Sequence, residues 1–443
     1  MSTTASRIII ELPDELRPPI SEAEALVEAD RCLACGGPHA PAPCAVACPA
    51  DIDVPGFIAA IAAGDADGAA KTIFAENLLG GTCARVCPVE VLCEGACVFV
   101  HSGRKPIAIG ALQRFATDAA RAEGPPPGRE RAPDKGRSVV VVGAGPSGMA
   151  CAGELAALGY GVTVFDEHDE PGGLVRYAIA PYREQQDPLP AEAAALAALG
   201  VEFRLGVPSA AAEAQRAIDA ADAVYLGVGL GPDTEVSYPG DDLPGVWNSL
   251  PFIEALKTGS PPRVGHDVIV VGGGNTAIDV AREALRLGAD RVTMVYRRTR
   301  AEMPAYSHEI DEAEAEGVRF SWLSDPIRLI GTHRVEAMEC RMMRLGDPDA
   351  SGRRRPEPVE GSEFVLRADT VVKAIGQRPR TELGEWVQGL EFDGPALRID
   401  TEGRTSNPRF FAGGDVANGG SSVVEAVREG KRAARAIDRW LGQ

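Results

Sequence analysis

SVVVVGAGPSGMACAGELAALGYGVTVFDEHDEPGG, residues 138–173, places a strand, a glycine turn, a helix and a second strand in direct succession. Val139–Val142 form an apolar β-branched run, typical of a strand buried on both faces. The second predicted strand, Gly161–Phe165, ends on an acid in the region where a ribose hydroxyl can be bound. The dinucleotide contacts predicted here are Gly143, Gly145, Pro146, Ser147, Gly148 and Asp166.

The glycines of this G-x-G-x-x-G pattern have separate tasks. One makes the tight turn, one lets the backbone approach a pyrophosphate, and one lets the helix pack on the strand. The helix N-terminus adds N–H groups and positive potential for the phosphates. A glycine turn after a buried strand also occurs for structural reasons alone, but here the full context of strand, turn, helix, strand and acid favours a dinucleotide site.

Composition limits the class of protein. With 443 residues the chain is too long for one core, which predicts several domains. The formal net charge of −19 argues against nucleic acid or an anionic membrane as partner. No apolar run approaches the roughly 18 residues that span a bilayer, and the N-terminal apolar patch is too short for a secretory signal. We therefore expect a cytoplasmic protein whose cysteines bind metal or do redox chemistry.

Eight of the ten cysteines lie between Cys32 and Cys97. They form a C-x2-C pair at 32 and 35, a C-x3-C pair at 44 and 48, and C-x3-C pairs at 83 and 87 and at 93 and 97. Cys48 and Cys87 are each followed by proline. The first run resembles the iron–sulfur pattern C-x2-C-x2-C-x3-C-P with a longer middle gap, in which the fourth cysteine, here Cys48, ligates the other cluster. Two structural zinc ions and simple packing are the alternatives. An electron-carrying head beside a flavin-type site favours two 4Fe–4S clusters.

A second glycine turn follows Asp267–Val271. In GGGNTA the third glycine of the pattern is replaced by alanine, which the fingerprint allows. The next strand, Arg291–Tyr296, ends in two arginines where an acid would contact a 2′-hydroxyl, and arginines suit a 2′-phosphate. Solvated surface arginines are the alternative to NADPH selection. The contacts predicted for NADPH are Gly272, Gly274, Asn275, Thr276, Ala277, Arg297 and Arg298.

The remaining predicted flavin contacts come from two segments. A glycine pair after the first βαβ unit can lie against a flat ring, although a plain turn is the alternative. A later strand, Phe410–Ala412, leads into Gly-Gly-Asp and a helix, where the acid either accepts from a flavin hydroxyl or only caps the helix. These predicted contacts are Gly172, Gly173, Leu174 and Arg183, then Gly414, Asp415 and Val423.

Together GAGPSG, GGLVRYAI, GGGNTAIDVAR, VTMVYRR with EMPA, FFAGGDV and the eight cysteines resemble a known family. It is the family of glutamate synthase small subunits and the NADPH-accepting half of dihydropyrimidine dehydrogenase. The resemblance runs from Cys32 to Trp440 and implies an α/β fold. In that fold a helical double 4Fe–4S domain precedes two Rossmann-like domains, and the FAD domain is interrupted by the NADPH domain.

The resemblance also implies the cluster ligands. Cluster one corresponds to Cys32, Cys35, Cys44 and Cys97, and cluster two to Cys48, Cys87, Cys93 and Gln113. Cys83 would be a spare thiol. The chain departs from the family at residues 177–180, Tyr-Ala-Ile-Ala in place of Tyr-Gly-Ile-Pro, which changes the flavin contact slightly.

The predicted organisation is an iron–sulfur domain at 1–122, a linker at 123–137, FAD domain segments at 138–262 and 373–443, and an NADPH domain at 263–372.

The resemblance implies hydride transfer from NADPH to FAD and electron transfer through the clusters to a catalytic partner subunit. That partner is either of the dihydropyrimidine dehydrogenase type or of the glutamate synthase type. Hydride transfer between two cofactors needs alignment rather than a side-chain acid or base, so no catalytic residue is predicted. The alternative is a nucleotide-binding scaffold with a zinc head and no redox activity.

Overall fold

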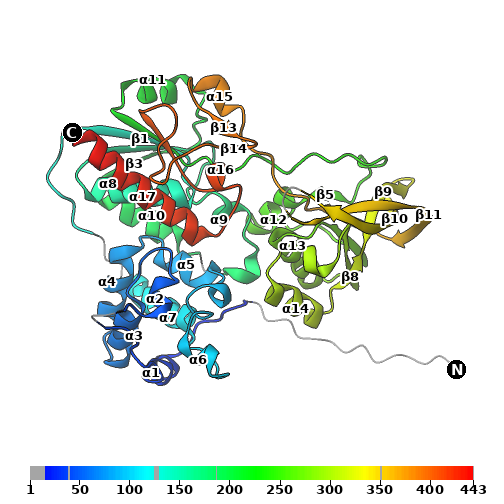
Figure 1. Ribbon diagram of the computed structural model, residues 1–443, viewed down its shortest axis with the longest axis horizontal. Coiled ribbons are helices and arrows are strands. Elements are labelled where there is room, and N and C mark those ends of the chain that lie inside the picture. Colours follow the sequence, from blue (N-terminus) through cyan, green and yellow to red (C-terminus); the bar gives the residue numbers. More distant parts are fainter. Residues whose placement is uncertain (1–14, 38–39, 124–128, 186, 350–351, 443) are drawn as a thin grey trace. The chain divides into compact units, whose positions relative to one another are not determined.

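The computed structural model describes residues 15–37, 40–123, 129–185, 187–349 and 352–442 (Figure 1). The predicted linker 123–137 and the N-terminal segment therefore lie partly outside the described residues. The chain divides into two compact units. Of the described residues, one unit comprises 15–16, 177–185 and 232–378, and the other comprises those within 17–176, 187–231 and 379–442. In the described part of the chain, no helix is both long enough and apolar enough to cross a membrane.

The larger unit begins with a helical domain, as the sequence predicts. Its helices are α1 (Glu22–Asp30), α2 (Pro43–Val46), α3 (Val54–Ala62), α4 (Ala66–Glu76), α5 (Gly80–Val86), η1 (Val89–Val91), α6 (Val98–His101) and α7 (Ile109–Glu123). Ser21 and Glu24 form a capping box at the start of α1. The core of this domain is apolar and small, with Ala25, Phe57, Ile61, Ile73 and Leu112 fully buried.

A five-stranded parallel sheet follows in the same unit, in the order β15-β4-β1-β2-β3. Its strands are β1 (Ser138–Val142), β2 (Gly161–Phe165), β3 (Val201–Arg204), β4 (Ala223–Leu226) and β15 (Phe410–Ala412). The helices of this half are α8 (Pro146–Ala157), α9 (Leu174–Tyr177), α10 (Leu189–Ala198), α11 (Ala212–Ala220), α15 (Leu383–Trp386), α16 (Asp415–Asn418) and α17 (Val423–Leu441), with a small β13–β14 hairpin (Phe392–Asp393, Ala396–Leu397). The C-terminal strand joins the sheet of the first glycine turn, so two distant parts of the sequence build one domain.

The smaller unit holds a second parallel sheet, in the order β5-β12-β6-β7-β8. Its strands are β5 (Val246–Asn248), β6 (Asp267–Val271), β7 (Arg291–Tyr296), β8 (Arg319–Trp322) and β12 (Thr370–Lys373). The helices η2 (Pro181–Arg183), α12 (Ser249–Lys257), α13 (Asn275–Arg286), η3 (Arg300–Glu302) and α14 (Ser307–Glu316) belong to it, as do the antiparallel strands β9 (Ser324–Gly331), β10 (Val335–Pro348) and β11 (Arg354–Arg367).

Two details differ from the expected strand assignment. The sequence predicts that residues 365–380 form a strand leading back to the first sheet, but β12 lies inside the second sheet, between β5 and β6. Strand β5, in a segment assigned from sequence to the FAD domain, pairs with β12. Parallel pairing joins strands far apart in sequence, and no local pattern specifies it. The predicted domain boundaries themselves stay predictions.

Helices α8 and α17 pack very closely in the larger unit. Gly430 lies in the interior of α17, and a Cβ placed on it would be 2.1 Å from the carbonyl oxygen of Ser147 on α8. Only glycine permits this approach, because any side chain would push the two helices apart. The contact ties the C-terminal helix to the helix that begins at the first glycine turn.

Candidate cofactor sites

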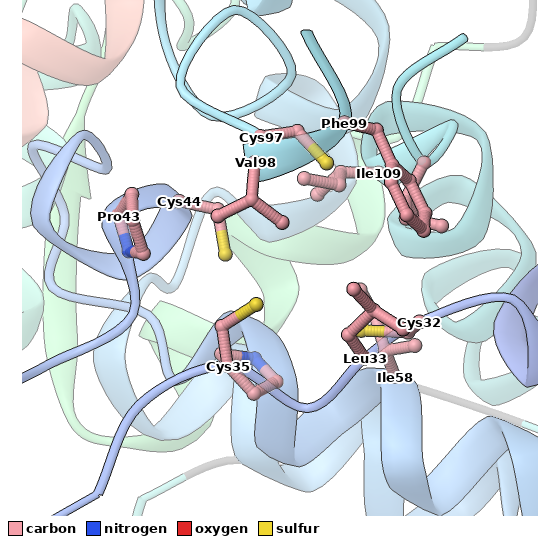
Figure 2. Close-up of a pocket in the computed structure, with 12 residues that line it drawn as sticks. Cys32, Leu33, Cys35, Pro43, Cys44, Ile58, Cys97, Val98, Phe99 and Ile109 are labelled. Carbon is pink, nitrogen blue, oxygen red and sulfur yellow. The ribbon is translucent and has the colours of Figure 1, made fainter. Parts of the chain in front are cut away.

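Four thiols of the helical domain surround one cavity. Cys32 and Cys35 follow α1, Cys44 lies in α2 and Cys97 precedes α6, and all four line the same pocket with Ile58, Phe99 and Ile109. Figure 2 shows their sulfur atoms around a common space. Burial, with a smaller effect of the Cys32 and Cys97 thiols, raises the pKa of Cys44 to about 11. Ionised thiols are unfavourable in a buried cavity without a cation. The four sulfur donors therefore fit a positively charged iron–sulfur centre.

The backbone of the cysteine loops is strained. Among the described residues, three that are not glycine have positive φ, and two of them lie in these loops: Ala34 (φ 46°) and Asp51 (φ 62°). Ala34 separates Cys32 from Cys35, and its conformation belongs to the turn that carries both thiols to one cavity. Left-handed backbone costs free energy and is found most often at functional sites.

A second group of thiols lies in the same domain. The hydrogen bond that the Cys87 thiol donates to Cys83 and burial are the largest causes that raise the pKa of Cys87, and the neighbouring thiols Cys83, Cys93 and Cys48 add to the effect. Burial raises the pKa of Cys93 far above its usual range, with Glu94 and Cys48 adding to the effect. Cys48, Cys87 and Cys93 are thus brought together as predicted ligands should be, and the predicted spare Cys83 is buried against Cys87.

Gln113 on α7 is nearly buried, and its amide nitrogen donates to the carbonyl of Gly80 at 2.8 Å. That bond orients the amide, whose oxygen is the atom that would ligate iron. Within the described ranges, no three His, Cys, Asp or Glu side chains are grouped closely enough to hold a single metal ion.

A buried carboxylate fixes the start of α5, the helix that carries Cys83 and leads to Cys87. Glu192 on α10 accepts hydrogen bonds from the backbone N–H groups of Gly81 (2.8 Å) and Thr82 (3.1 Å) and from the Thr82 hydroxyl (2.6 Å). Its side chain is fully buried, and burial raises its pKa to about 7 although these bonds lower it. Nothing in the sequence around Glu192 predicts this role, since it is one glutamate in an alanine-rich helix.

The predicted flavin contacts of the larger unit meet at the first glycine turn. Gly172 donates its backbone N–H to Ala144 in that turn at 2.8 Å. A Cβ on Gly173 would lie 2.9 Å from the Cα of Gly145, so the glycine pair lies directly against the turn. Asp166 accepts from the N–H of Ala144 at 2.7 Å. Although burial raises the pKa of Asp166, hydrogen bonds from His168 and Ala144 lower it overall, so the acid is ionised.

The Gly-Gly-Asp segment reaches the same place. Gly414 has φ 75°, and a Cβ there would lie 2.9 Å from the Cβ of Ser147. Its N–H donates to the buried Glu429 carboxylate of α17, while Asp415 accepts from the N–H of Ser421 at 3.2 Å. Burial, and then Glu429, raise the pKa of Asp415. The first glycine turn, the glycine pair and the Gly-Gly-Asp segment therefore lie together beside a buried acid, an arrangement that fits FAD.

The smaller unit has a cavity of about 340 Å³ at the second glycine turn. It is lined by predicted residues Gly272, Gly274, Thr276, Arg297 and Arg298 and by others that include Gly273, Asp233, Tyr238, Pro304, Asp325 and Arg353. Ala277 is fully buried behind the turn, and Asn275 accepts from the N–H of Tyr306, which holds the EMPA loop beside it. The cavity has the size and the donors that a dinucleotide needs.

The two arginines of this cavity differ in their surroundings. Arg297 is exposed and lines the cavity. Arg298 is almost buried, and its guanidinium donates to the Arg354 carbonyl (2.8 Å) and to Asp349 (2.9 Å). Arg298 thus also anchors the β10–β11 hairpin. Arg353 of that hairpin also lines the cavity. The sequence did not predict this contact, because nothing in the run of three arginines shows which of them faces a nucleotide site.

Arg183, predicted as a flavin contact, lies elsewhere. Its guanidinium pairs with Asp279 (2.7 Å) on α13 and Glu309 (2.8 Å) on α14, and its side chain is 11% exposed. The Tyr182 hydroxyl donates to the same Asp279 at 2.5 Å, and the Tyr182 N–H donates to Glu283. Arg183 therefore anchors segment 177–185 to the nucleotide-binding unit, a role that a sequence motif read in isolation does not reveal.

Comparisons with known proteins agree with this arrangement. Residues 10–125 match the family described as dihydropyrimidine dehydrogenase domain II, 4Fe-4S cluster, and residues 137–430 match the pyridine nucleotide-disulphide oxidoreductase family. The chain is 35% identical over 448 residues to the glutamate synthase [NADPH] small chain of Escherichia coli, which covers 96% of this chain and 93% of that protein. The chain belongs to this oxidoreductase family.

A further relative and a solved structure extend the comparison. The beta subunit of the NADP(+)-dependent formate dehydrogenase of Moorella thermoacetica is 38% identical over 92% of this chain, which spans 61% of that protein. FprA from Mycobacterium tuberculosis shares the fold, with a TM-score of 0.57 and 22% identity over 70% of this chain and 85% of its own. The predicted family and fold class are confirmed.

Replacing Arg183 by alanine leaves Asp279 and Glu309 as two buried carboxylates without their shared cation. We expect the free energy of unfolding of the smaller unit to fall by about 3–5 kcal/mol, as when one partner of a buried ion pair is removed. Urea denaturation measures this change. Arg300→Ala is the control, because Arg300 pairs with Asp311 and Glu314 at the surface and its loss should cost about 1 kcal/mol or less. Equal losses for the two variants would refute the anchoring role.

Glu192 predicts a pH dependence of stability. Its pKa in the folded protein is about 7, above the ordinary value of 4.5, so the folded protein binds this proton more tightly than the unfolded chain. Its stabilising contribution is complete below pH 4.5 and is lost as the pH rises to about 7. Glu192→Gln should remove this pH-dependent decrease in the free energy of unfolding, which is on the order of 3 kcal/mol. Urea midpoints measured between pH 4.5 and 8 give the slope. The control, Glu202→Gln at an exposed position of β3, should keep the wild-type slope, and an unchanged slope in Glu192→Gln would refute the assignment.

Proposed function

We propose that this chain is the electron-input subunit of a larger oxidoreductase, taking hydride from NADPH onto FAD and passing electrons through two 4Fe–4S clusters to a catalytic partner. The observation that carries the proposal is the presence of all three kinds of site in one chain. A thiol-lined cavity, a glycine-turn site of the flavin type and a nucleotide cavity with arginines, each including predicted residues, support the proposal. The alternative scaffold with a zinc head has no support from the relatives.

The residues at the flavin site bind and orient rather than react. The backbone N–H groups at the start of α8 would hold the FAD pyrophosphate, and Asp166 a ribose hydroxyl. Gly172 and Gly173 pack against the first glycine turn at Gly145, and Asp415 with the start of α17 at Val423 completes the site. Bound FAD would supply the chemistry that converts a two-electron hydride donor into single electrons.

The nucleotide cavity would bind NADPH. Gly272–Ala277 supply the phosphate-binding turn, and Arg297 is the residue best placed for the 2′-phosphate because it is exposed in the cavity. Arg298 would contribute mainly by holding the hairpin from which Arg353 reaches the cavity.

The clusters would be held by the two thiol groups. Cys32, Cys35, Cys44 and Cys97 ligate the first cluster. Cys48, Cys87, Cys93 and Gln113 ligate the second, with Cys83 beside Cys87 as a non-ligand. The relatives include a small chain and a beta subunit, so we infer that electrons leave to a partner subunit. All ten cysteines are free, which fits a reducing compartment such as the cytoplasm.

The purified chain tests this proposal directly. We expect flavin absorption bands, a broad iron–sulfur shoulder and about eight iron atoms per chain, as two four-iron clusters require. NADPH should reduce ferricyanide, but the chain alone should reduce neither uracil nor 2-oxoglutarate with glutamine. Cys48→Ala should lose about half of the iron, whereas the matched Cys83→Ala should keep it. Two zinc ions without acid-labile sulfide, or uracil reduction by the isolated chain, would refute the proposal.

Arg297 provides a separate test of cofactor choice. A hydrogen bond to a charged group contributes roughly 1.5–3 kcal/mol, so Arg297→Ala should reduce the preference for NADPH over NADH about 10- to 150-fold. The measurement is the ratio of kcat/KM for the two nucleotides with ferricyanide as acceptor. Arg300→Ala, outside the residues that line the cavity, is the control and should keep the ratio. An unchanged ratio in Arg297→Ala would remove Arg297 from the site.

A further inference from the structure

A buried lysine of the C-terminal helix reaches into the iron–sulfur domain. Lys431 on α17 is 5% exposed, and its ammonium donates to the Ala50 carbonyl at 2.8 Å and the Glu76 carbonyl at 2.6 Å. It also pairs with the Glu76 carboxylate at 3.0 Å. All three acceptors lie more than 350 positions away in the sequence. Burying an ammonium is costly unless its donors are used, and here all three donors have a partner.

The Ala50 contact leads to a predicted cluster ligand. Ala50 follows Cys48 and Pro49, and the backbone N–H groups of Ile52 and Ala50 donate to the Cys48 sulfur. The carbonyl of Ala50 is held by Lys431, so the lysine fixes the residue whose N–H donates to that sulfur. Hydrogen bonds to cluster sulfurs and nearby charge both set the reduction potential of an iron–sulfur cluster.

The partner of Lys431 does not cancel its charge. The Glu76 side chain is 38% exposed, whereas that of Lys431 is 6% exposed. Water therefore screens the carboxylate more effectively than the ammonium. Asp51 adds negative charge beside Cys48, and Lys431 contributes a positive field to the same loop. This field favours an added electron on a nearby cluster.

The same helix also reaches the flavin site. Val423, its first residue, lies eight positions before Lys431, which is about 12 Å along a helix. Glu429 binds the N–H of Gly414, and Gly430 packs on Ser147 of α8. Three successive residues, 429–431, thus contact the flavin segment, the first glycine-turn helix and the cluster loop.

We propose that Lys431 is a positioning residue for electron transfer from the flavin to the cluster that Cys48 ligates. It holds the Cys48 loop against α17 and raises the reduction potential of that cluster, which gains the single electron that the reduced flavin loses. The inference rests on the proposed function, because it requires both cofactors. Glu76 has the opposite electrostatic effect and lowers the potential.

The test compares Lys431→Met, Lys431→Arg and Glu76→Gln, with Lys71→Met as control. Lys71 is an exposed lysine of α4 that pairs with Asp67. Redox titration followed by electron paramagnetic resonance gives the potential of each cluster, and iron analysis gives their occupancy. A unit charge about 10 Å away changes an electron-transfer equilibrium roughly tenfold at an effective dielectric constant of about 20. Lys431→Met should therefore lower one cluster potential by about 59 mV, the one-electron equivalent of tenfold.

The signs of the shifts decide the outcome. We expect Glu76→Gln to raise the same potential, Lys431→Arg to keep it near the wild-type value, and Lys71→Met to leave it unchanged. In stopped-flow mixing with NADPH, the rate of cluster reduction relative to flavin reduction should fall in Lys431→Met. Full iron content with unshifted potentials in Lys431→Met, or shifts of the same sign in Lys431→Met and Glu76→Gln, would overturn the inference. Absence of flavin or iron from the wild-type chain would instead overturn the proposed function.

Discussion

The close approach of α8 and α17 is the constraint on which the larger unit depends. A Cβ on Gly430 would lie 2.1 Å from the Ser147 carbonyl, so the two helices are as near as their backbones allow. This approach lets Glu429 hold the Gly-Gly-Asp segment beside the first glycine turn. It also carries Lys431 to the segment that follows Cys48. One helix, α17, thus contacts both a segment proposed for flavin binding and the loop after Cys48.

Polar groups buried at such contacts are satisfied by partners from distant parts of the chain. Glu192 receives three hydrogen bonds from the start of α5, and Lys431 donates three to the end of α4 and the cysteine loop. A buried carboxylate or ammonium would cost several kcal/mol without them. Their common effect is to fix helix ends, where backbone groups need external partners. The iron–sulfur domain gains rigidity in this way despite its small core.

Local patterns in the sequence predicted the parts of the structure that depend on local chemistry. Both glycine turns and the strands that precede them follow from residue spacing alone. Cys151 and Cys340 are buried, as their positions in a helix and an alternating strand indicate. Family and fold class were predicted from the combined motifs and are confirmed.

Pairings between distant segments could not be predicted in the same way. The place of β12 between β5 and β6 depends on strand pairing across more than a hundred residues. Arg183 occurs in a plausible flavin segment, yet its partners are two carboxylates on α13 and α14. Arg298 is adjacent to Arg297, but hydrogen bonds to the β10–β11 hairpin occupy it. Burial and ion pairing in three dimensions determine these partners, and residue spacing does not encode them.

The anchored segment 177–185 also matters for modular design. Because Tyr182 and Arg183 are bound to α13 and α14, the nucleotide-binding unit is not one continuous stretch of gene. A chimaera that exchanges only residues 232–378 would separate Asp279 and Glu309 from their native arginine. A transplant of cofactor specificity between relatives therefore has to carry these nine residues as part of the donor module.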